Sequence, residues 1–196
     1  MTQTLLIFIR NPQLGKVKTR LARTVGDQEA LRIYQILLEK TRSAALRVQA
    51  ERWLFYSDFI EKNDGWPETD FFKKIQANGD LGERMEQAFR TAFEAGANKA
   101  VIIGSDCPQL TGETLQMAFD ELDKADFVLG PVPDGGYYLL GMKRLEPSVF
   151  RDIEWSTEMV RTQTLEKVQA AGMSCALLPV LSDVDTEEDW LALQPL

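Results

Sequence analysis

The amino-acid sequence predicts an α/β protein whose mostly parallel sheet is covered by helices on both faces. Short apolar segments alternate along the chain with segments in which apolar residues recur about every 3.6 positions, as in helices. This β-α-β-α order is typical of parallel sheets. TLLIFIR (4–10) and AVIIGSD (100–106) are almost continuously apolar, which indicates strands buried on both sides. The length of 196 residues predicts a single domain over 1–196.

The first half of the chain contains three expected strands and two expected helices. The strands are 4–10, 52–58 and 72–77, and the helices are 27–48 and 81–95. Asp27 is placed to cap the first helix, and Asp80 and the glutamate three residues later have the spacing of a capping box before the second. Gly96 is placed to end that second helix. Residues 59–70 are charged and hold a glycine and a proline, so we expect a loop there.

The second half continues the same alternation. Its expected strands are 100–106, 126–132, 136–142 and 174–181, and its expected helices are 111–124, 157–171 and a closing helix within DTEEDWLAL (185–193). The strands 126–132 and 136–142 follow each other so closely that they form either an antiparallel pair or a pair split by a functional loop. In parallel sheets of this class, ligands bind beyond the carboxyl ends of the strands. The candidate motifs lie in loops at such strand ends.

The composition excludes several classes of site. The net charge of −8 argues against nucleic-acid binding. The absence of histidine excludes Ser-His and Cys-His catalysis and imidazole zinc sites, so a general base must be Asp, Glu, Lys or Tyr. The two cysteines, Cys107 and Cys175, make no disulfide framework. No apolar run reaches the ~20 residues of a membrane span. We therefore expect a cytoplasmic protein with neither a membrane nor a nucleic-acid partner.

A basic loop follows the first expected strand. NPQLGKVKTR (11–20) differs from the Walker and GxGxxG phosphate loops, and residues 1–26 contain no acid that would neutralise its cations. Glycine permits close backbone approach to a ligand, and the start of a helix directs backbone amides toward an anion. We expect the nucleotide phosphates to contact Gly15, Lys16, Lys18, Thr19 and Arg20. The alternative is a solvated basic turn that has no ligand.

Two aspartates are candidate metal ligands. Asp106 ends a hydrophobic strand in GSDCP, where a carboxylate is costly unless it is paired or coordinated, and Asp185 follows the last expected strand in DVDTEED. Two carboxylates with phosphate oxygens and water suit Mg²⁺ or Mn²⁺, which would neutralise charge on a leaving phosphate. We therefore expect Asp106 to be a catalytic residue that acts by binding the metal. Alternatively, Asp106 forms a turn or cap near Thr111, and Asp185 caps the last helix with Glu188 as its partner.

The glycine pair in DGGYYLLG (134–141) is a further candidate. Gly135 and Gly136 permit close approach of the backbone to a ligand, and Tyr137 begins the next strand. We expect these three residues to contact the substrate. Asp134 is a candidate catalytic group that contacts the acceptor or the metal. The alternative is a plain tight turn between two strands.

The segment NGDLGERM (78–85) is a candidate nucleotide contact. Capping explains Asp80 on its own, but it does not explain Gly82 or Arg84, and an arginine can reach a phosphate or a base. We expect all three to contact the nucleotide. Trp155 in EWST either stacks on a sugar or packs as a core or rim aromatic. With no histidine to activate it, Cys107 is expected to be a small buried residue and not a nucleophile.

Five motifs together resemble the radical-SAM/selenodomain-associated transferase family, which is described as glycosyltransferase-like. They are GKVKTRLA, GDLGERM, GSDCP, GPVPDGGYYLLG and DVDTEED, in this order and at this spacing. The resemblance spans almost the whole chain and implies a three-layer, Rossmann-like GT-A fold, the fold of the nucleotide-diphospho-sugar transferases, with a mixed central sheet. It implies that Asp106 stands where the superfamily has its metal-binding aspartates. Asp185 matches an aspartate of related nucleotidyltransferases, with Glu187 where proline is common.

The resemblance implies a metal-dependent glycosyltransferase-like enzyme. The donor would be a nucleotide-activated sugar, the acceptor a small molecule and the cofactor Mg²⁺ or Mn²⁺. A second hypothesis is a nucleotidyltransferase that uses a nucleoside triphosphate, because guanylyl- and cytidylyltransferases share the basic first loop. A third is a non-catalytic nucleotide-binding module. The sequence makes no prediction of the base, the sugar, the acceptor or the oligomeric state.

Overall fold

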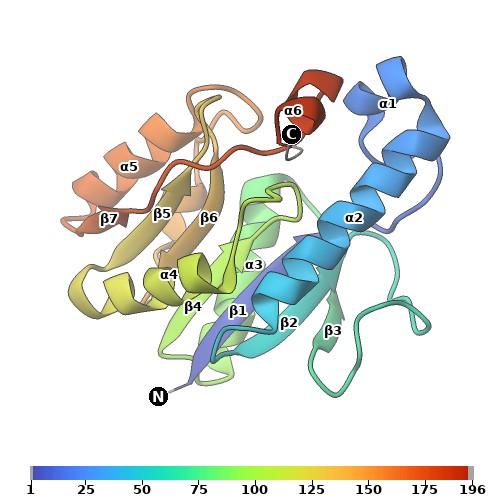
Figure 1. Ribbon diagram of the computed structural model, residues 1–196. Helices are drawn as coiled ribbons and strands as arrows, with labels where there is room; N and C mark the ends of the chain where they lie inside the picture. Colours follow the sequence, from blue (N-terminus) through green and yellow to red (C-terminus); the bar gives the residue numbers. More distant parts are fainter. Residues whose placement is uncertain (1, 194–196) are drawn as a thin grey trace.

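A mixed sheet forms the middle layer of the protein (Figure 1). The computed structural model describes residues 2–193, and within them the sheet has seven strands in the order β3-β2-β1-β4-β6-β5-β7. The strands are β1 (Gln3–Ile9), β2 (Glu51–Tyr56), β3 (Phe72–Ile75), β4 (Lys99–Ile103), β5 (Phe127–Pro131), β6 (Tyr137–Met142) and β7 (Cys175–Leu177). β6 is antiparallel to β4 and β5, and the other pairs are parallel. The predicted, mostly parallel mixed sheet is therefore confirmed.

Helices cover both faces of this sheet. They are α1 (Thr19–Val25), α2 (Asp27–Ala45), α3 (Leu81–Glu94), α4 (Gly112–Lys124), α5 (Val160–Ala170), α6 (Glu187–Ala192) and the short 3₁₀ helix η1 (Pro147–Phe150). Alternate residues of β1 show why both faces are needed. Leu5 and Ile7 pack in the core under α2 and α4, whereas Leu6 packs in the core under α3, η1 and α5. The β-strand places successive side chains on opposite faces, so an unbroken apolar strand needs helices on both.

A third, smaller core joins the two ends of the chain. Leu21 of α1 and Ile33 and Leu37 of α2 pack with Val184, which lies three residues before α6 and is fully buried. Figure 1 shows α1 and α6 near each other beyond one end of the sheet. This cluster brings the loop after β1 and the segment after β7 together. Lys18 and Val184, which are in contact, are 166 residues apart in the sequence.

Several element boundaries differ from the sequence-based expectation. The expected helix 27–48 is preceded by α1, and Gly26 ends α1 and begins α2, so Asp27 lies in the first turn and caps nothing. The expected strand 174–181 pairs only over Cys175–Leu177. Pro179 has no N–H to donate, and beyond it the Leu181 amide still donates a hydrogen bond of 3.2 Å to the Pro131 carbonyl oxygen. The hairpin alternative for 126–142 is confirmed, because β5 and β6 pair antiparallel.

The cap of the last helix also differs from the expectation. Thr186 is the N-cap residue of α6, and Asp189 completes a capping box with it. The alternative box of Asp185 and Glu188 is therefore wrong by one residue. The capping box expected for α3 is confirmed, since Asp80 accepts from the Glu83 amide and Glu83 accepts from the Asp80 amide. Among the described residues, no helix has the length and apolar character of a membrane span.

Candidate functional site

A cleft of about 500 Å³ lies at the carboxyl ends of β1 and β4. Its lining includes eight of the residues expected in the site, namely Lys16, Lys18, Thr19, Arg20, Arg84, Asp106, Tyr137 and Asp185. Apolar side chains such as Phe8, Met85 and Leu140 also line it. The cleft thus has both charged and apolar side chains in its lining, which is the combination that a nucleotide with a flat base and a polyphosphate requires.

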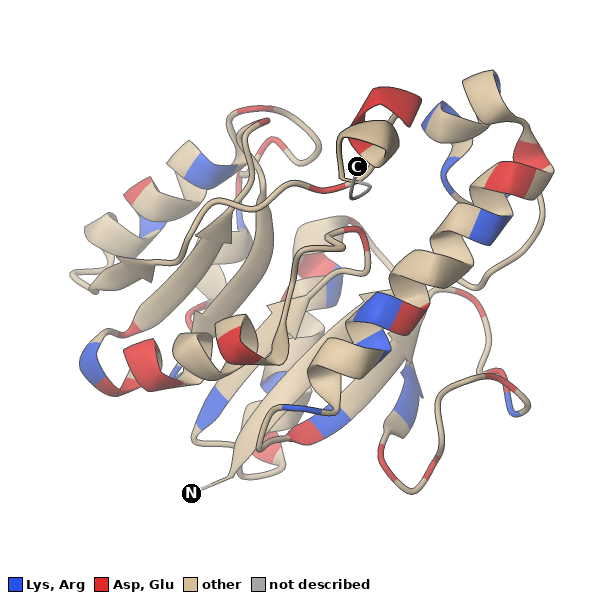
Figure 2. Ribbon diagram, viewed as in Figure 1, with Lys and Arg blue, Asp and Glu red and all other residues tan. Residues whose placement is uncertain are grey.

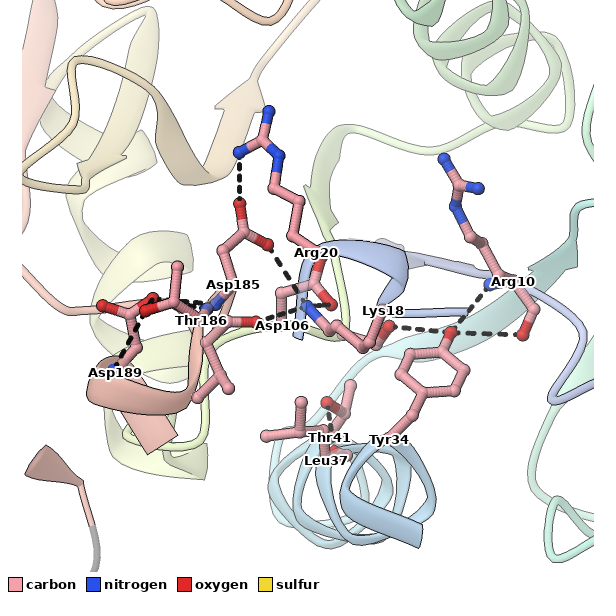
Figure 3. A network of polar contacts seen from close by, with 12 residues as sticks. Arg10, Lys18, Arg20, Tyr34, Leu37, Thr41, Asp106, Asp185, Thr186 and Asp189 are labelled. Atoms are coloured by element: carbon pink, nitrogen blue, oxygen red, sulfur yellow. Dashed lines mark hydrogen bonds and ion pairs between the residues drawn. The ribbon is translucent and has the colours of Figure 1, made fainter. Parts of the chain in front are cut away.

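Lys18 lies between the two predicted metal ligands (Figure 3). Its Nζ atom is 2.5 Å from Oδ1 of Asp106 and 3.6 Å from Oδ1 of Asp185. The same ammonium donates a hydrogen bond of 2.6 Å to the carbonyl oxygen of Val184. The Lys18 side chain is only 6% exposed, whereas both carboxylates are roughly half exposed. One buried cation is therefore surrounded by three oxygens from two distant segments.

Arg20 is a second cation, and it contacts Asp185 from the solvent-exposed side. Its Nη1 atom is 3.1 Å from Oδ2 of Asp185, and its side chain is 69% exposed. Figure 2 shows the same opposition of charge on a larger scale, with basic positions at α1 near acidic positions of α6. Because Arg20 is exposed, this ion pair contributes little stability, and the guanidinium is available to an anionic ligand.

Backbone contacts fix the position of Asp106. β4 ends at Ile103, and the chain leaves the sheet through Gly104 and Ser105. The Val184 amide then donates a hydrogen bond of 2.9 Å to the Asp106 carbonyl oxygen. Since Val184 is anchored in the third core cluster, Asp106 is held at a defined distance from the segment that carries Asp185.

The α6 capping box positions Asp185. Oδ2 of Asp189 accepts hydrogen bonds from the Asp185 amide at 3.0 Å, the Thr186 amide at 2.8 Å and the Thr186 hydroxyl at 2.9 Å. Burial opposes ionisation of Asp189, but these hydrogen bonds outweigh it and lower the pKa of Asp189. Because Asp189 and Thr186 do the capping, the carboxylate of Asp185 is left to face Lys18 and Arg20.

The sequence reasoning missed Tyr34 as a residue of the cleft. Its hydroxyl accepts from the Arg10 amide at 2.9 Å, lies 3.1 Å from the Arg10 carbonyl and lies 3.2 Å from the Ser105 hydroxyl. Burial raises the pKa of Tyr34 to about 12, so the phenol stays protonated. It joins the ends of β1 and β4 across the floor of the cleft. Tyr34 belongs to the apolar stripe of α2, and nothing in that stripe distinguishes it.

Gln76 is a second residue that the sequence reasoning missed. Its amide nitrogen donates to the Ile9 carbonyl at 3.0 Å and to the Phe55 carbonyl at 3.2 Å. Its amide oxygen accepts from Nη1 of Arg84 at 2.9 Å. Gln76 thereby ties the ends of β1 and β2 together and holds Arg84 against the cleft. A polar residue at the end of the expected strand 72–77 was the available signal.

Asp183 is the third residue that the sequence reasoning missed, and three other aspartates act on it through their negative charges. Burial, together with the negative charges of Asp134, Asp185 and Asp106, raises the pKa of Asp183 to about 6. The turn between β5 and β6, which carries Asp134, is therefore close enough to act on the 183–189 segment. Asp134 itself accepts from the Gly136 amide at 3.0 Å in a tight turn.

Two of the candidate glycines are required by packing within the protein. A Cβ on Gly82 would lie 2.6 Å from the Trp155 ring, and a Cβ on Gly135, where φ is +91°, would overlap the carbonyl of Glu158. The segment that follows η1 therefore lies directly on the start of α3 and on the β5–β6 turn. Trp155 packs against Gly82 in the way expected of a core or rim aromatic.

Six of the expected residues do not belong to the described lining of the cleft. They are Gly15, Asp80, Gly82, Asp134, Gly135 and Gly136. Gly15 has a φ of +73°, which the turn of the basic loop requires. Cys107 is buried, and burial raises the pKa of its thiol to about 11. The expectation that Cys107 is a small buried residue is confirmed.

The oxygens around Lys18 fit a divalent cation. In the described part of the chain, no group of three or more His, Cys, Asp or Glu side chains converges on one point. Oδ1 of Asp106, Oδ1 of Asp185 and the Val184 carbonyl nevertheless converge on a single ammonium, which shows that this position accepts a positive charge. Two carboxylates and a carbonyl are the hard oxygen donors that Mg²⁺ and Mn²⁺ bind, with phosphate and water completing the shell.

Solved structures of other proteins share the fold of this chain. A protein from Desulfovibrio desulfuricans G20, provisionally named a nucleotide-diphospho-sugar transferase, is 33% identical, with a TM-score of 0.89 over 98% of this chain and 87% of that chain. The 4-diphosphocytidyl-2C-methyl-D-erythritol synthase of Anaerococcus prevotii is 11% identical, with a TM-score of 0.60 over 97% and 93% of the two chains. No curated protein matches the sequence.

A third structure adds a metal to this comparison. Rv0371C from Mycobacterium tuberculosis, solved as a complex with manganese, is 16% identical, with a TM-score of 0.54 over 98% of each chain. At these low identities, the second and third structures show the fold alone. They confirm the expected fold of nucleotide-diphospho-sugar transferases and nucleotidyltransferases.

A family model gives the membership of the chain. The model described as "Uncharacterized protein conserved in bacteria (DUF2064)" matches residues 40–157, which include α3, β4 and the β5–β6 turn. Together with the 33% identity to the D. desulfuricans protein, this match establishes the relationship. The chain belongs to the DUF2064 family and has the fold of nucleotide-diphospho-sugar transferases.

Proposed function

We propose that the protein is a metal-dependent transferase that moves a group from a nucleotide-activated sugar to a small acceptor. The observation that carries this proposal is the convergence of Lys18 and Arg20 with Asp106 and Asp185 in one cleft whose lining also has apolar side chains. The 33% identical relative, which is named for nucleotide-diphospho-sugar transfer, supports the choice of donor.

The proposal gives each charged group of the cleft a role toward the donor. Asp106 and Asp185 would hold Mg²⁺ or Mn²⁺, which neutralises charge on the leaving diphosphate. Lys16 and Arg20 reach the cleft from the basic loop and screen the diphosphate from the other side. Arg84 is held by Gln76 in the lining of the cleft and contacts the nucleotide there. Thr19 and Tyr137 line the same cleft and complete the proposed contacts.

The acceptor side of the proposal rests on the β5–β6 turn. Asp134 is the proposed group that orients the acceptor hydroxyl, which attacks the anomeric carbon of the sugar. Its negative charge is one of those that raise the pKa of Asp183, which supports a position of Asp134 near the 183–189 segment. Nucleotide contacts by Gly15, Asp80, Gly82, Gly135 and Gly136 stay predictions.

A nucleotidyltransferase is the second candidate function. The observation that favours it is the number of cations in the cleft lining, which comprises Arg10, Lys16, Lys18, Arg20 and Arg84. Such a positive charge suits a triphosphate as well as a diphosphate. An acceptor phosphate would then attack the α-phosphorus, and pyrophosphate would leave. A third hypothesis, a non-catalytic nucleotide-binding module, predicts thermal stabilisation by nucleotides without turnover.

Product analysis tests these alternatives. The protein is incubated with a panel of sugar nucleotides and nucleoside triphosphates with Mn²⁺ and candidate acceptors. Release of a nucleoside diphosphate supports sugar transfer, and release of pyrophosphate supports nucleotidyl transfer. Asp106→Asn should abolish either release and leave the folded state intact, because the Asp106 side chain is 48% exposed. Nucleotide binding without release of either product would contradict both enzymatic functions.

The proposal extends to the family, the domain and the location of the protein. The five sequence motifs support membership among the radical-SAM/selenodomain-associated transferases. We also propose one nucleotide-diphospho-sugar transferase-like domain over 1–196. A cytoplasmic location, with no nucleic-acid or membrane partner, stays a prediction from composition and charge.

A further inference from the structure

We infer that Lys18 occupies the metal position of the donor site and that a divalent cation binds there only when the Lys18 ammonium leaves. This inference rests on the proposed function, since it concerns the same carboxylates. It adds competition between Lys18 and the metal for one position, which the proposed function does not require. The empty site would be closed to metal by one of the protein's own cations, and donor and metal would bind cooperatively.

The geometry around Lys18 supports this inference directly. The ammonium is 2.5 Å from Asp106 Oδ1, 3.6 Å from Asp185 Oδ1 and 2.6 Å from the Val184 carbonyl oxygen. A magnesium-type ion would bind the same oxygens at about 2.0–2.1 Å. The two cations would therefore lie almost at one point. Like charges at that separation repel strongly, so the position can hold one of them and not both.

The burial of Lys18 distinguishes it from the other cations of the basic loop. Its side chain is 6% exposed, whereas Arg20 is 69% exposed and Lys16 is an exposed residue. An exposed lysine near two carboxylates would screen them loosely and yield to a metal at little cost. A buried lysine that also donates to a carbonyl must exchange all of its contacts when a metal enters.

The backbone at Lys18 indicates that this arrangement is held against a local preference. Lys18 has a φ of +48°, one of three positive-φ residues other than glycine among the described residues. Such a conformation is disfavoured for a residue with a side chain and persists where surrounding contacts impose it. At Lys18 these contacts are the ion pair with Asp106 and the hydrogen bond to the Val184 carbonyl oxygen.

A polyphosphate would supply the new partner for a displaced Lys18. The donor phosphates are proposed to lie against Asp106 and Asp185 through the metal, within reach of the same basic loop. A ligand that takes the ammonium away from the carboxylates raises their affinity for the metal, and by linkage the metal raises the affinity for that ligand. The inference thus predicts that metal binds weakly alone and tightly with the donor.

Titration with Mn²⁺ alone tests the inference without any nucleotide. Free Mn²⁺ is measured by electron paramagnetic resonance for the wild-type protein, Lys18→Met and Lys16→Met. We expect Lys18→Met to bind Mn²⁺ about tenfold more tightly than Lys16→Met, which loses the same charge from the same loop. Equal affinities of the two variants would overturn the inference and leave the metal site itself standing. Absence of Mn²⁺ binding to all three proteins would overturn it as well.

A second measurement covers the case in which Lys18→Met fails to fold. Lys18→Gln keeps a donor for the Val184 carbonyl, and it is titrated in the same way. In the wild-type protein, acetic anhydride labelling of Lys18 is followed by mass spectrometry and normalised to Lys16. Saturating Mn²⁺ should increase labelling of Lys18 severalfold, because the ammonium leaves its buried position. Unchanged labelling while Mn²⁺ is bound would overturn the inference, whatever the donor assays show about turnover.

Discussion

The amide of Val184 donates a hydrogen bond of 2.9 Å to the carbonyl oxygen of Asp106. This bond joins the segment after β4 to the segment before α6, and each segment supplies one carboxylate to Lys18. The side chain of Val184 is fully buried between α1 and α2. The spacing of the two carboxylates therefore depends on a hydrophobic contact outside the cleft.

Truncation of Val184 should therefore weaken both stability and the site. Val184→Ala leaves a cavity in the third core cluster and should lower the free energy of unfolding by about 2 kcal/mol, measured by urea denaturation. It should also reduce Mn²⁺ affinity or donor turnover, because the 183–189 segment loses its anchor. Val168→Ala is the control, since Val168 of α5 is also buried but belongs to a different core cluster. An equal loss of turnover in both variants would contradict a specific role of Val184.

Removal of the Asp189 carboxylate should disorganise Asp185 without touching the cleft. Asp189→Ala loses three hydrogen bonds at the start of α6 and should lower the free energy of unfolding by about 1 kcal/mol. Turnover should fall because the Asp185 amide loses its partner. Glu188→Ala is the matched control, since it removes the same charge from the same turn and leaves the capping box intact. If Glu188→Ala were as harmful, capping by Asp189 would not be the cause.

The contribution of Asp189 to stability should depend on pH. Its pKa is lowered in the folded protein, so its stabilising effect is complete above the unfolded pKa of about 3.9. The effect is lost as the pH falls through the lower, folded pKa. The difference in unfolding free energy between wild type and Asp189→Ala should thus be full at pH 7 and should shrink at pH 3. A difference that stayed constant between these two pH values would contradict an ionised Asp189 as the cap.

A side chain at position 82 should disturb the segment that packs on α3. Gly82→Ala gains helix propensity, but its Cβ would lie 2.6 Å from the Trp155 ring, and the net effect should be destabilising by about 1–3 kcal/mol. Trp155→Leu should relieve the overlap with the ring, while the Phe150 carbonyl oxygen stays 2.8 Å from the new Cβ. The double variant should therefore be more stable than the sum of the two single effects predicts, but less stable than Trp155→Leu alone. Strict additivity in thermal or urea unfolding would show that Gly82 and Trp155 are not coupled.

The thiol of Cys107 should be unreactive in the folded protein. Burial raises its pKa to about 11, and the residue is buried next to Asp106. Iodoacetamide at pH 8 should leave Cys107 unmodified by mass spectrometry until urea unfolds the chain, and Cys107→Ala should retain turnover. Rapid alkylation of the native protein at this residue would reopen the possibility of a cysteine nucleophile.

The convergence of the two carboxylates could be predicted from the sequence. Asp106 and Asp185 both follow expected strands of one mostly parallel sheet, and such strand ends meet at one edge. The apolar periodicity identifies the strands and helices. Because each of them must bury its apolar face, their alternation predicts one sheet covered by helices. The same logic placed the basic loop after β1 at this edge.

The detailed arrangement of the site could not be predicted in the same way. The pairing of Lys18 with Asp106 depends on a left-handed backbone conformation, which sequence patterns assign to glycine and not to lysine. The sequence predicts ligand contacts at Gly82, which capping does not explain, and at Gly135, where glycine permits close approach, but it does not identify the side chains and backbone that pack there. The neighbours are Trp155 and Glu158, which only the tertiary fold brings near.

The reversed direction of β6 has a consequence for how such a protein diversifies. β4 and β5 run parallel on either side of it, so the short β5–β6 connection emerges at the same edge as the carboxyl end of β4. Lengthening or shortening this hairpin would alter one wall of the site and leave the basic loop and the Asp106 segment in place. Evolution or engineering could thereby change the molecule that binds at this wall by altering a single connection, while the proposed polyphosphate site stays constant.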